Sequence, residues 1–304
     1  MADAFVNSAA GSPWTGTSAP AALAARGVCR EAPGRKVRLT RTAQVRCVSA
    51  QVFGPREVQT QTVKLYYNRL CPYAARTWLA LEEKKVSYDK QQIGLTVFGE
   101  EKQAWFVDAI AKSIPVNRSK LGTVPALSIL GANGSPDSDS ARFLVGSAIT
   151  AEFVDDFGSD PAAPDLMLRH GNPLERAELR YLLSEIDVLL SRCNALIVNK
   201  NPSNDVELKD KISEQLEDVE ALLELNSYDG KYCMGDFFTL ADCAMAPLIN
   251  RFAVALPELR SYKLLDRCHR LEQLDVSYSA RPAYLAIRVS NEEVLEKYGY
   301  KARR

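Results

Sequence analysis

The chain has 304 residues, of which 46% are hydrophobic and 25% are charged, and its 38 basic side chains are balanced by 38 acidic ones. This length and apolar content indicate one or two globular domains and exclude collagen, a long coiled coil and full disorder. Without a basic excess to neutralise phosphates, nucleic acid is not expected as a main partner. The longest uncharged run, Ala4 to Ala25, contains two prolines and several Ser and Thr. It is not the composition of a membrane-spanning helix, so we expect a soluble protein.

The charge is unevenly distributed along the chain. Residues 1–57 carry eight basic and three acidic side chains, a balance of +5, which leaves −5 for the remainder. A segment rich in Arg, Ser, Thr and Ala, and poor in acids, is typical of an organelle transit peptide. We therefore expect residues 1–57 to lie outside the folded domains and to direct the protein to the chloroplast stroma. A mitochondrial presequence and a disordered tail are the alternatives.

The cysteines favour free thiols over metal ligands or disulfides. There are seven, with no Cys-x-x-Cys pair and only two histidines in the chain: Cys29, Cys47, Cys71, Cys193, Cys233, Cys243 and Cys268. This pattern offers no ligand set for a structural metal, and we expect none. Thiols outside a disulfide framework suit a reducing compartment such as stroma or cytosol.

The folded part is expected to begin with a strand, a helix and a second strand. Val63–Tyr67 and Val86–Ile93 are β-favouring runs, and Pro72 marks the first position of the helix between them, with Cys71 at its cap. A helix N-terminus lowers the pKa of a thiol, so this position predicts a reactive Cys71. Ala74 stands where a dithiol enzyme has its resolving cysteine, so a lone thiolate would exchange with an external thiol. The alternative is a buried, unreactive cysteine.

Two later segments bear on the same site. Val124-Pro125 comes directly before a predicted strand, and in a thioredoxin-like domain its peptide bond is expected to be cis, with the Val124 backbone facing Cys71. After a polar loop from Gly131 to Ser140 and a fourth strand, Ser147 is expected to cap a helix that runs through Phe157. Such a helix N-terminus binds carboxylates, although a capping serine without a ligand would show the same pattern.

With these motifs in this order, the chain from Val63 to about Ala286 resembles a cysteine-type glutathione transferase, nearest to the omega and lambda classes, with dehydroascorbate reductases as related enzymes. The resemblance rests on Cys-Pro-Tyr-Ala at 71–74, on the Val-Pro element and on the serine that opens the third helix. It implies a thioredoxin-like α/β domain followed by an all-helical domain. It also implies glutathione as a co-substrate, with no metal.

The resemblance further implies a role for individual residues. Cys71 would form the mixed disulfide with glutathione, and the Val124 backbone would pair with the cysteinyl backbone of glutathione. Ser147 would receive its γ-glutamyl carboxylate, and Lys102 would lie near its glycyl end. The motifs also place Tyr73 and Pro125 in the glutathione site.

Gly146 departs from the family pattern, which has Glu or Asp immediately before the serine. Losing one charge-assisted contact would weaken glutathione binding by about 1.5 to 3 kcal/mol. This departure favours a second reading, in which the protein is a non-catalytic member that holds a tetrapyrrole or another hydrophobic ligand. Cys71 favours the enzyme, a thiol transferase or reductase acting on a small electrophilic, disulfide or oxidised substrate.

The second half is predicted to be helical. Two stripes at helical spacing, beginning at Leu182 and Leu208, are explained by core packing. Thr239 and Asp242 have the spacing of a capping box before an apolar, buried helix that Pro247 should bend. We predict a thioredoxin-like domain at 61–158, a helical domain at 172–290 and a polar tail at 291–304, either extending the last helix or loose. Monomer and homodimer both remain open.

Overall fold

The computed structural model describes residues 62–113, 122–130, 142–158, 160–227 and 230–304. All of them belong to one compact unit, Pro55–Arg304. The predicted transit peptide at 1–57 and the predicted loop at 131–140 lie outside the described residues.

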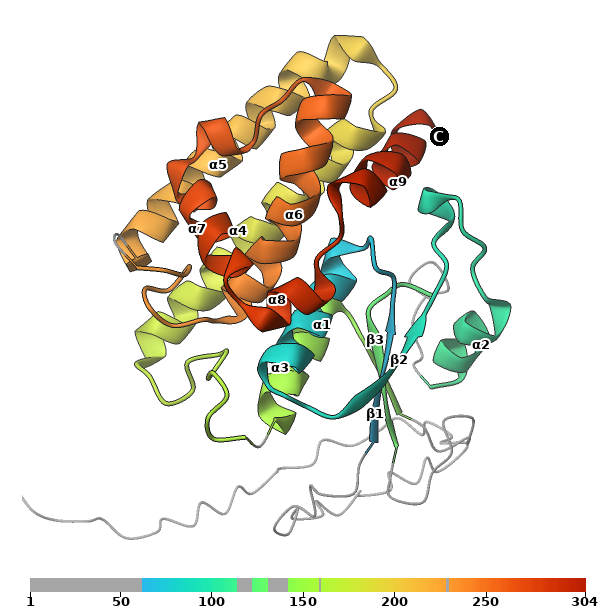
Figure 1. Ribbon diagram of the computed structural model, residues 1–304, viewed down its shortest axis with the longest axis vertical. Helices are drawn as coiled ribbons and strands as arrows, with labels where there is room; N and C mark the ends of the chain where they lie inside the picture. The colour runs from blue at the N-terminus through green and yellow to red at the C-terminus, as the bar shows by residue number, and fades with distance from the viewer. Residues whose placement is uncertain (1–61, 114–121, 131–141, 159, 228–229) are drawn as a thin grey trace, which may run out of the picture. The chain divides into compact units, whose positions relative to one another are not determined.

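The N-terminal part is a four-stranded sheet with helices on both faces (Figure 1). Its elements, in chain order, are β1 (Thr62–Tyr67), α1 (Pro72–Glu83), β2 (Tyr88–Gln92), η2 (Thr96–Phe98), α2 (Ala104–Ser113), β3 (Ala126–Leu130), β4 (Arg142–Val145) and α3 (Ser147–Phe157). The strand order is β2-β1-β3-β4, with β1 parallel to β2 and antiparallel to β3. This confirms the expected strand–helix–strand unit and the thioredoxin-like arrangement.

Helices α1 and α3 lie between the sheet and the rest of the molecule, and α2 covers the opposite face (Figure 1). The sequence of α1 explains its position, because Pro72 occupies the first turn and the helix is apolar on several faces. Ala75, Leu79 and Leu81 are fully or almost fully buried. Such a helix is stable only between two layers, so α1 packs on the sheet and on the helical domain at once.

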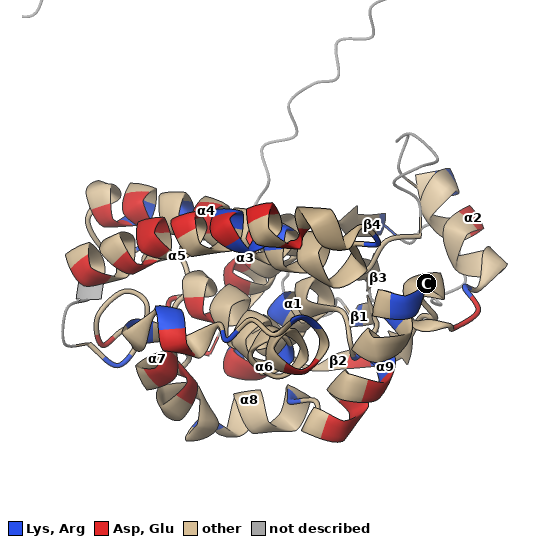
Figure 2. Ribbon diagram, turned by 90° about the horizontal axis from the view of Figure 1, so that it is seen from above, with Lys and Arg blue, Asp and Glu red and all other residues tan. Residues whose placement is uncertain are grey.

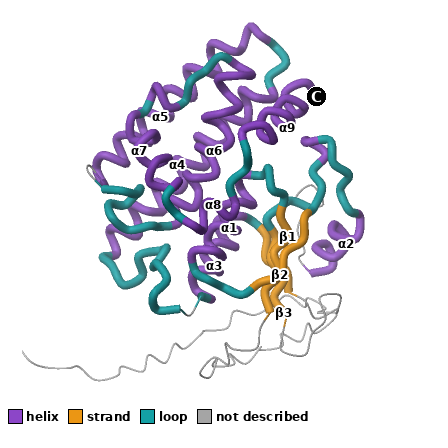
Figure 3. Tube along the Cα trace, in the orientation of Figure 1, coloured by secondary structure: helices purple, strands orange, loops and turns teal. Residues whose placement is uncertain are grey.

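The second part is entirely helical (Figure 3). Its elements are α4 (Pro173–Val198), η4 (Pro202–Asn204), α5 (Asp205–Ser227), α6 (Leu240–Arg260), η5 (Leu265–Arg267), α7 (His269–Ser279), α8 (Pro282–Ile287) and α9 (Asn291–Arg303). Acidic and basic residues are interspersed along α4 and α5, as on solvated helix faces (Figure 2).

Helix α6 is the core of the helical domain. As predicted, Thr239 precedes it and Asp242 accepts the Thr239 backbone N–H at 2.7 Å, and the helix contains Pro247. Among the described helices, α6 alone has the length and hydropathy of a membrane span, but 83% of that window is buried inside the protein. It is therefore explained as a core helix.

Residues 291–304, whose conformation the sequence left open, form a helix of their own. Ser290 begins α9 by accepting the Glu293 N–H on its hydroxyl at 3.2 Å. Val294 and Tyr298 are fully buried. Helix α9 packs on α4, on α6 and on η2 of the N-terminal domain, so the end of the chain reaches back to the first domain.

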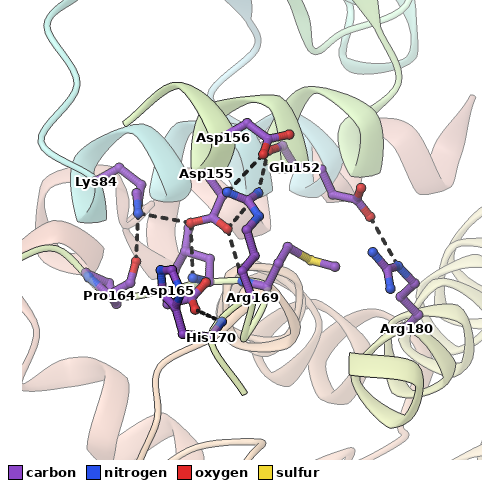
Figure 4. Close-up of polar contacts among 11 residues, drawn as sticks. Lys84, Glu152, Asp155, Asp156, Pro164, Asp165, Arg169, His170 and Arg180 are labelled. Carbon is purple, nitrogen blue, oxygen red and sulfur yellow. Dashed lines mark hydrogen bonds and ion pairs between the residues drawn. The ribbon is translucent and has the colours of Figure 1, made fainter. Parts of the chain in front are cut away.

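A buried ion-pair network holds the linker that follows α3. Asp155, near the end of α3, lies at its centre (Figure 4). Its carboxylate accepts from Lys84, the C-cap of α1, at 3.0 Å and from Arg169 of the linker at 2.9 Å. It also accepts the backbone N–H groups of Leu166 and Met167, both at 3.1 Å. With four donors its buried charge is fully compensated, which fixes the linker against the first domain.

Candidate active site

The turn between β1 and α1 presents Cys71. Asn68, almost fully buried, holds the turn: its side-chain oxygen accepts the Leu70 N–H at 3.0 Å, and its backbone carbonyl accepts the Cys71 N–H at 3.1 Å. Cys71 is the N-cap of α1, and the Ala75 N–H donates to its carbonyl at 3.0 Å. The predicted placement of the thiol at a helix start is confirmed.

The Val-Pro element lies opposite this cysteine. The Val124–Pro125 peptide bond is cis, as predicted. The Cys71 Sγ lies 3.8 Å from the Val124 carbonyl oxygen, and the Cys71 residue is only 8% exposed. Pro125 is buried directly before β3, so Cys71, Val124 and Pro125 are brought together as the sequence predicted.

The sequence predicted a low pKa for the Cys71 thiol, and this prediction is wrong. Burial is the largest effect, and it raises the pKa of the Cys71 thiol above its ordinary value. The backbone N–H groups of Ala74 and Tyr73 act in the predicted direction and lower that pKa. The positive charges of Arg251 and Lys301 lower it as well. The helix N-terminus therefore acts on the thiol in the expected direction, but desolvation outweighs it.

A second cysteine occupies the same kind of position, which the sequence analysis missed. Cys268 is the N-cap of α7 and is 1% exposed. Burial, and to a smaller extent the Glu220 carboxylate, raises the pKa of Cys268 to about 12. All five described cysteines are free and buried, as expected for a chain without a disulfide framework.

The expected cap of α3 is also corrected. Gly146, not Ser147, is the N-cap, with φ at +94°, and Ser147 is the first residue of the helix. The Ser147 hydroxyl instead accepts a hydrogen bond from Arg76 of α1 at 3.3 Å. Because Gly146 supplies the left-handed backbone that begins α3, the serine oxygen is turned toward α1 and not toward its own helix.

Arg76 connects this serine to the helical domain, a link that sequence reasoning missed. The Arg76 side chain is 2% exposed and forms a two-pronged ion pair with Asp187 of α4, whose side chain is 41% exposed. The one available signal was a lone arginine within the apolar run of α1. A buried guanidinium needs a carboxylate, but the sequence does not show which one.

Tyr73 and Lys102 are the remaining residues that were predicted for the site. Tyr73, in the first turn of α1, is half-buried, and burial and then the Asp187 charge raise its pKa. Lys102 lies beside the loop before Val124: a Cβ placed on Gly122 would be 3.2 Å from its Cδ. Gly122 has φ at +74°, so the lysine covers a turn that only glycine adopts readily.

Two buried side chains of the helical domain donate hydrogen bonds to the turn between β1 and α1 that presents Cys71. Arg251 of α6 donates to the Arg69 carbonyl at 2.8 Å, and the Tyr298 hydroxyl of α9 donates to the Leu70 carbonyl at 3.2 Å. They act on the two residues that precede Cys71. Neither was predicted, since both lie more than 180 residues away in the chain. Within the described part of the chain, no three His, Cys, Asp or Glu side chains gather as metal ligands.

Comparison with known proteins identifies the family of this chain. Residues 70–156 match the model of the glutathione S-transferase N-terminal domain, and residues 177–267 match that of the C-terminal domain. A probable glutathione S-transferase of Coccidioides immitis is 26% identical over 200 residues, 60% of this chain and 76% of that protein. Glutathione S-transferase omega-2 of Rattus norvegicus is 24% identical over 212 residues, 69% of this chain and 73% of that protein.

Among solved structures, a trimeric glutathione transferase from Leishmania has the same fold, with a TM-score of 0.64 and 23% identity. The likeness covers 79% of this chain and 48% of that one, so the chain spans about half of its length. The two family models together match more than half of the 304 residues. The chain therefore belongs to the glutathione S-transferase family and has omega-class members among its relatives.

Proposed function

We propose that this protein is a glutathione-dependent thiol transferase or reductase that uses Cys71 as its nucleophile. The observation that carries the proposal is the position of Cys71, at the start of α1 with its sulfur against the Val124 carbonyl. Ala74 in place of a second cysteine favours a mechanism with one protein thiol. Lambda-type deglutathionylation and dehydroascorbate reduction both belong to this chemistry.

The reaction balances with glutathione as the only co-reactant. The Cys71 thiolate attacks the glutathionyl sulfur of a mixed disulfide, a Cys71–glutathione disulfide forms, and the substrate leaves as a thiolate that takes a proton from solvent. A second glutathione thiolate then attacks the glutathionyl sulfur of this intermediate. Oxidised glutathione leaves, and Cys71 returns as a thiolate. No metal takes part in either step.

The proposed glutathione site runs from Val124 to Ser147. The cysteinyl backbone of glutathione would pair with Val124 beside Pro125, and its glycyl end would approach Lys102. Its γ-glutamyl carboxylate would bind the Ser147 hydroxyl and the α3 N-terminus. Asp187, held by Arg76 and partly exposed, would receive the glutamyl ammonium in place of the carboxylate missing at Gly146.

Intact-protein mass spectrometry after incubation with oxidised glutathione tests the proposal. We expect one glutathionyl adduct on the wild-type protein, none on Cys71→Ser, and an unchanged adduct on Cys268→Ser. Cys268→Ser is the matched control because Cys268 is also a buried helix N-cap. An adduct that persists in Cys71→Ser, or none on the wild type, would contradict the proposal.

The alternative is a binding protein for a tetrapyrrole or other hydrophobic ligand. The burial of Cys71 and the glycine at 146 favour it. Calorimetry with glutathione and with a porphyrin discriminates the two, since the binding protein would bind the porphyrin and not glutathione.

Two further proposals concern the location of the protein in the cell and its oligomeric state. Residues 1–57 would act as a transit peptide for the chloroplast stroma, which fusion of this segment to a fluorescent protein tests; mitochondrial fluorescence would support the alternative address. Homodimerisation is proposed from family membership, and light scattering of the purified protein measures it.

A further inference from the structure

The loop between β2 and α2, residues 93–103, is folded around one carboxylate. The half-buried Glu100 side chain accepts the Leu95 backbone N–H at 3.1 Å and the Asn68 side-chain N–H at 2.5 Å, both on the same oxygen. Asn68 Nδ2 also donates to the Ile93 carbonyl at 2.9 Å. Hydrogen bonds to a carboxylate are shorter and stronger than those between neutral groups. The loop is therefore fastened to Asn68 at two points.

Asn68 also forms the turn that presents Cys71. Its side-chain oxygen accepts the Leu70 N–H at 3.0 Å, and its backbone carbonyl accepts the Cys71 N–H at 3.1 Å. A carboxylate only accepts hydrogen bonds, so Glu100 requires the NH₂ group of the Asn68 amide on its own side. This orientation leaves the amide oxygen to the Leu70 N–H. Glu100 therefore fixes the Asn68 side chain in the orientation that the cysteine turn needs.

The same loop contacts the other side of the site. Lys102 lies beside Gly122, two residues before Val124, since a Cβ on Gly122 would be 3.2 Å from the Lys102 Cδ. The Cys71 sulfur lies 3.8 Å from the Val124 carbonyl oxygen. The loop therefore contacts both backbone segments that meet at this sulfur. Glu100 reaches the cysteine turn through the asparagine, and Lys102 reaches the segment before Val124.

Helix α9 packs on the outer side of this loop. A Cβ on Gly99, whose φ is +79°, would be 3.0 Å from the Tyr300 Cζ, so the tyrosine ring lies directly on the loop backbone. The Phe98 ring is 5.4 Å from the ring of Tyr298, whose hydroxyl donates to the Leu70 carbonyl at 3.2 Å. The loop and the cysteine turn therefore rest on the same helix.

We propose that Glu100 is a positioning residue for Cys71, which acts through Asn68 to fix the turn that presents the sulfur opposite Val124. The inference rests on the proposed function in taking Cys71 as the nucleophile toward glutathione. Reaction with a bound partner requires the reacting atoms to be close and aligned, so a small displacement of the turn slows disulfide exchange. Alkylation by a small reagent from solution has no bound partner and depends on thiolate fraction and access instead.

The experiment measures two rates for Cys71 at one pH, adduct formation with oxidised glutathione and alkylation by iodoacetamide, both by mass spectrometry. A change in thiol pKa or exposure acts on both rates, so their ratio reports the position of the sulfur. We expect Glu100→Ala to lower the ratio of glutathione to iodoacetamide rates by about tenfold. Glu100→Gln should keep the wild-type ratio, because a single amide oxygen can accept both N–H groups. Glu101→Ala, at the neighbouring exposed acid, is the matched control and should leave the ratio unchanged.

An unchanged ratio in Glu100→Ala, or an equal fall in Glu101→Ala, overturns the inference. Should Glu100→Ala not fold, Asn68→Asp places two carboxylates in contact and should lower the ratio, and adding Glu100→Gln should restore it because the new amide donates to the aspartate.

Amide hydrogen exchange tests the same link without glutathione. The Leu70 and Cys71 N–H groups both donate to Asn68, so both should exchange faster in Glu100→Ala than in Glu100→Gln. Absence of a glutathionyl adduct on the wild type would contradict the proposed function alone. Equal exchange of these two amides in Glu100→Ala and the wild type would contradict this inference alone.

Discussion

Cys71 and Cys268 occupy the same structural position, the N-cap of a helix, and differ in the charges around them. Both are buried, and both sulfurs are reached by backbone N–H groups of the following turn. The positive charges of Arg251 and Lys301 lower the pKa of Cys71, whereas the Glu220 carboxylate raises that of Cys268. A helix start is therefore insufficient for a reactive thiol, and the side chains brought in by other helices decide which cysteine ionises first.

This contrast predicts the order of alkylation. Cys71 should react with iodoacetamide at lower pH than Cys268, because the charges around it favour the thiolate. Glu220→Gln should lower the Cys268 pKa from about 12 and speed its alkylation several-fold, without changing Cys71. Peptide mapping of the alkylated protein across pH measures both. Equal rates for the two cysteines in the wild type would contradict the prediction.

Cys71→Ser should abolish thiol transfer and dehydroascorbate reduction, because a hydroxyl cannot form the mixed disulfide. A serine hydroxyl can still hydrogen-bond a glutathione thiolate, so weak glutathione conjugation should remain or emerge. Steady-state assays of the two activities on one preparation check this. Full reductase activity in the Ser variant would show that Cys71 is not the nucleophile.

Substitution of Gly146 should affect stability and affinity in opposite directions. Its φ of +94° disfavours any side chain, although the space around it is open, with only Ile149 within 4 Å. Gly146→Glu and Gly146→Gln should both lower the free energy of unfolding, by about 1 to 3 kcal/mol. Only Gly146→Glu adds the missing charge, so it should bind glutathione up to about tenfold tighter than Gly146→Gln. Urea unfolding and calorimetry separate the two effects.

Asp187→Asn should weaken both glutathione binding and the domain contact. It leaves the Arg76 guanidinium buried with only a neutral oxygen as its partner, which we expect to lower the free energy of unfolding by roughly 2 kcal/mol. Glutathione affinity should fall by about tenfold if Asp187 receives the glutamyl ammonium. Glu185→Gln is the control, because Glu185 lies on the same helix and contacts Gln215 instead. Unchanged affinity in Asp187→Asn would remove Asp187 from the site.

The pKa of Lys301 also allows a prediction of how the stability of the protein depends on pH. Its native pKa, about 8, is lower than the value of about 10.4 in an unfolded chain. Between these two pH values the unfolded state binds more protons than the native state. The free energy of unfolding therefore increases as pH rises through this range. Below pH of about 8 the buried ammonium is a cost to the folded state. Lys301→Met should therefore be no less stable than the wild type near pH 7, and should lack the rise toward pH of about 10. Urea midpoints at both pH values measure this, and a large loss of stability at pH 7 would contradict it.

The sequence alone was enough to predict the local features of the site. Pro72 marks the start of α1 and so places Cys71 at its cap, and Val124-Pro125 before β3 indicates the cis bond opposite it. The helix start depends on a backbone rule that acts over a few residues, so it can be recognised without the fold. The cis bond was expected only because the motifs resemble a thioredoxin-like domain, since most X-Pro bonds are trans. The two-domain fold followed from the same motifs and from the helical periodicity of the second half.

Only the tertiary structure decided the electrostatics. Arg76 and Asp187 are 111 residues apart in the chain, and Arg251 reaches a carbonyl 182 residues away. The direction of the Cys71 pKa and the side chain that Ser147 contacts both depend on such distant partners and on burial. A sequence pattern reports neither, because desolvation and Coulomb energies are set by distances in space and not by spacing along the chain.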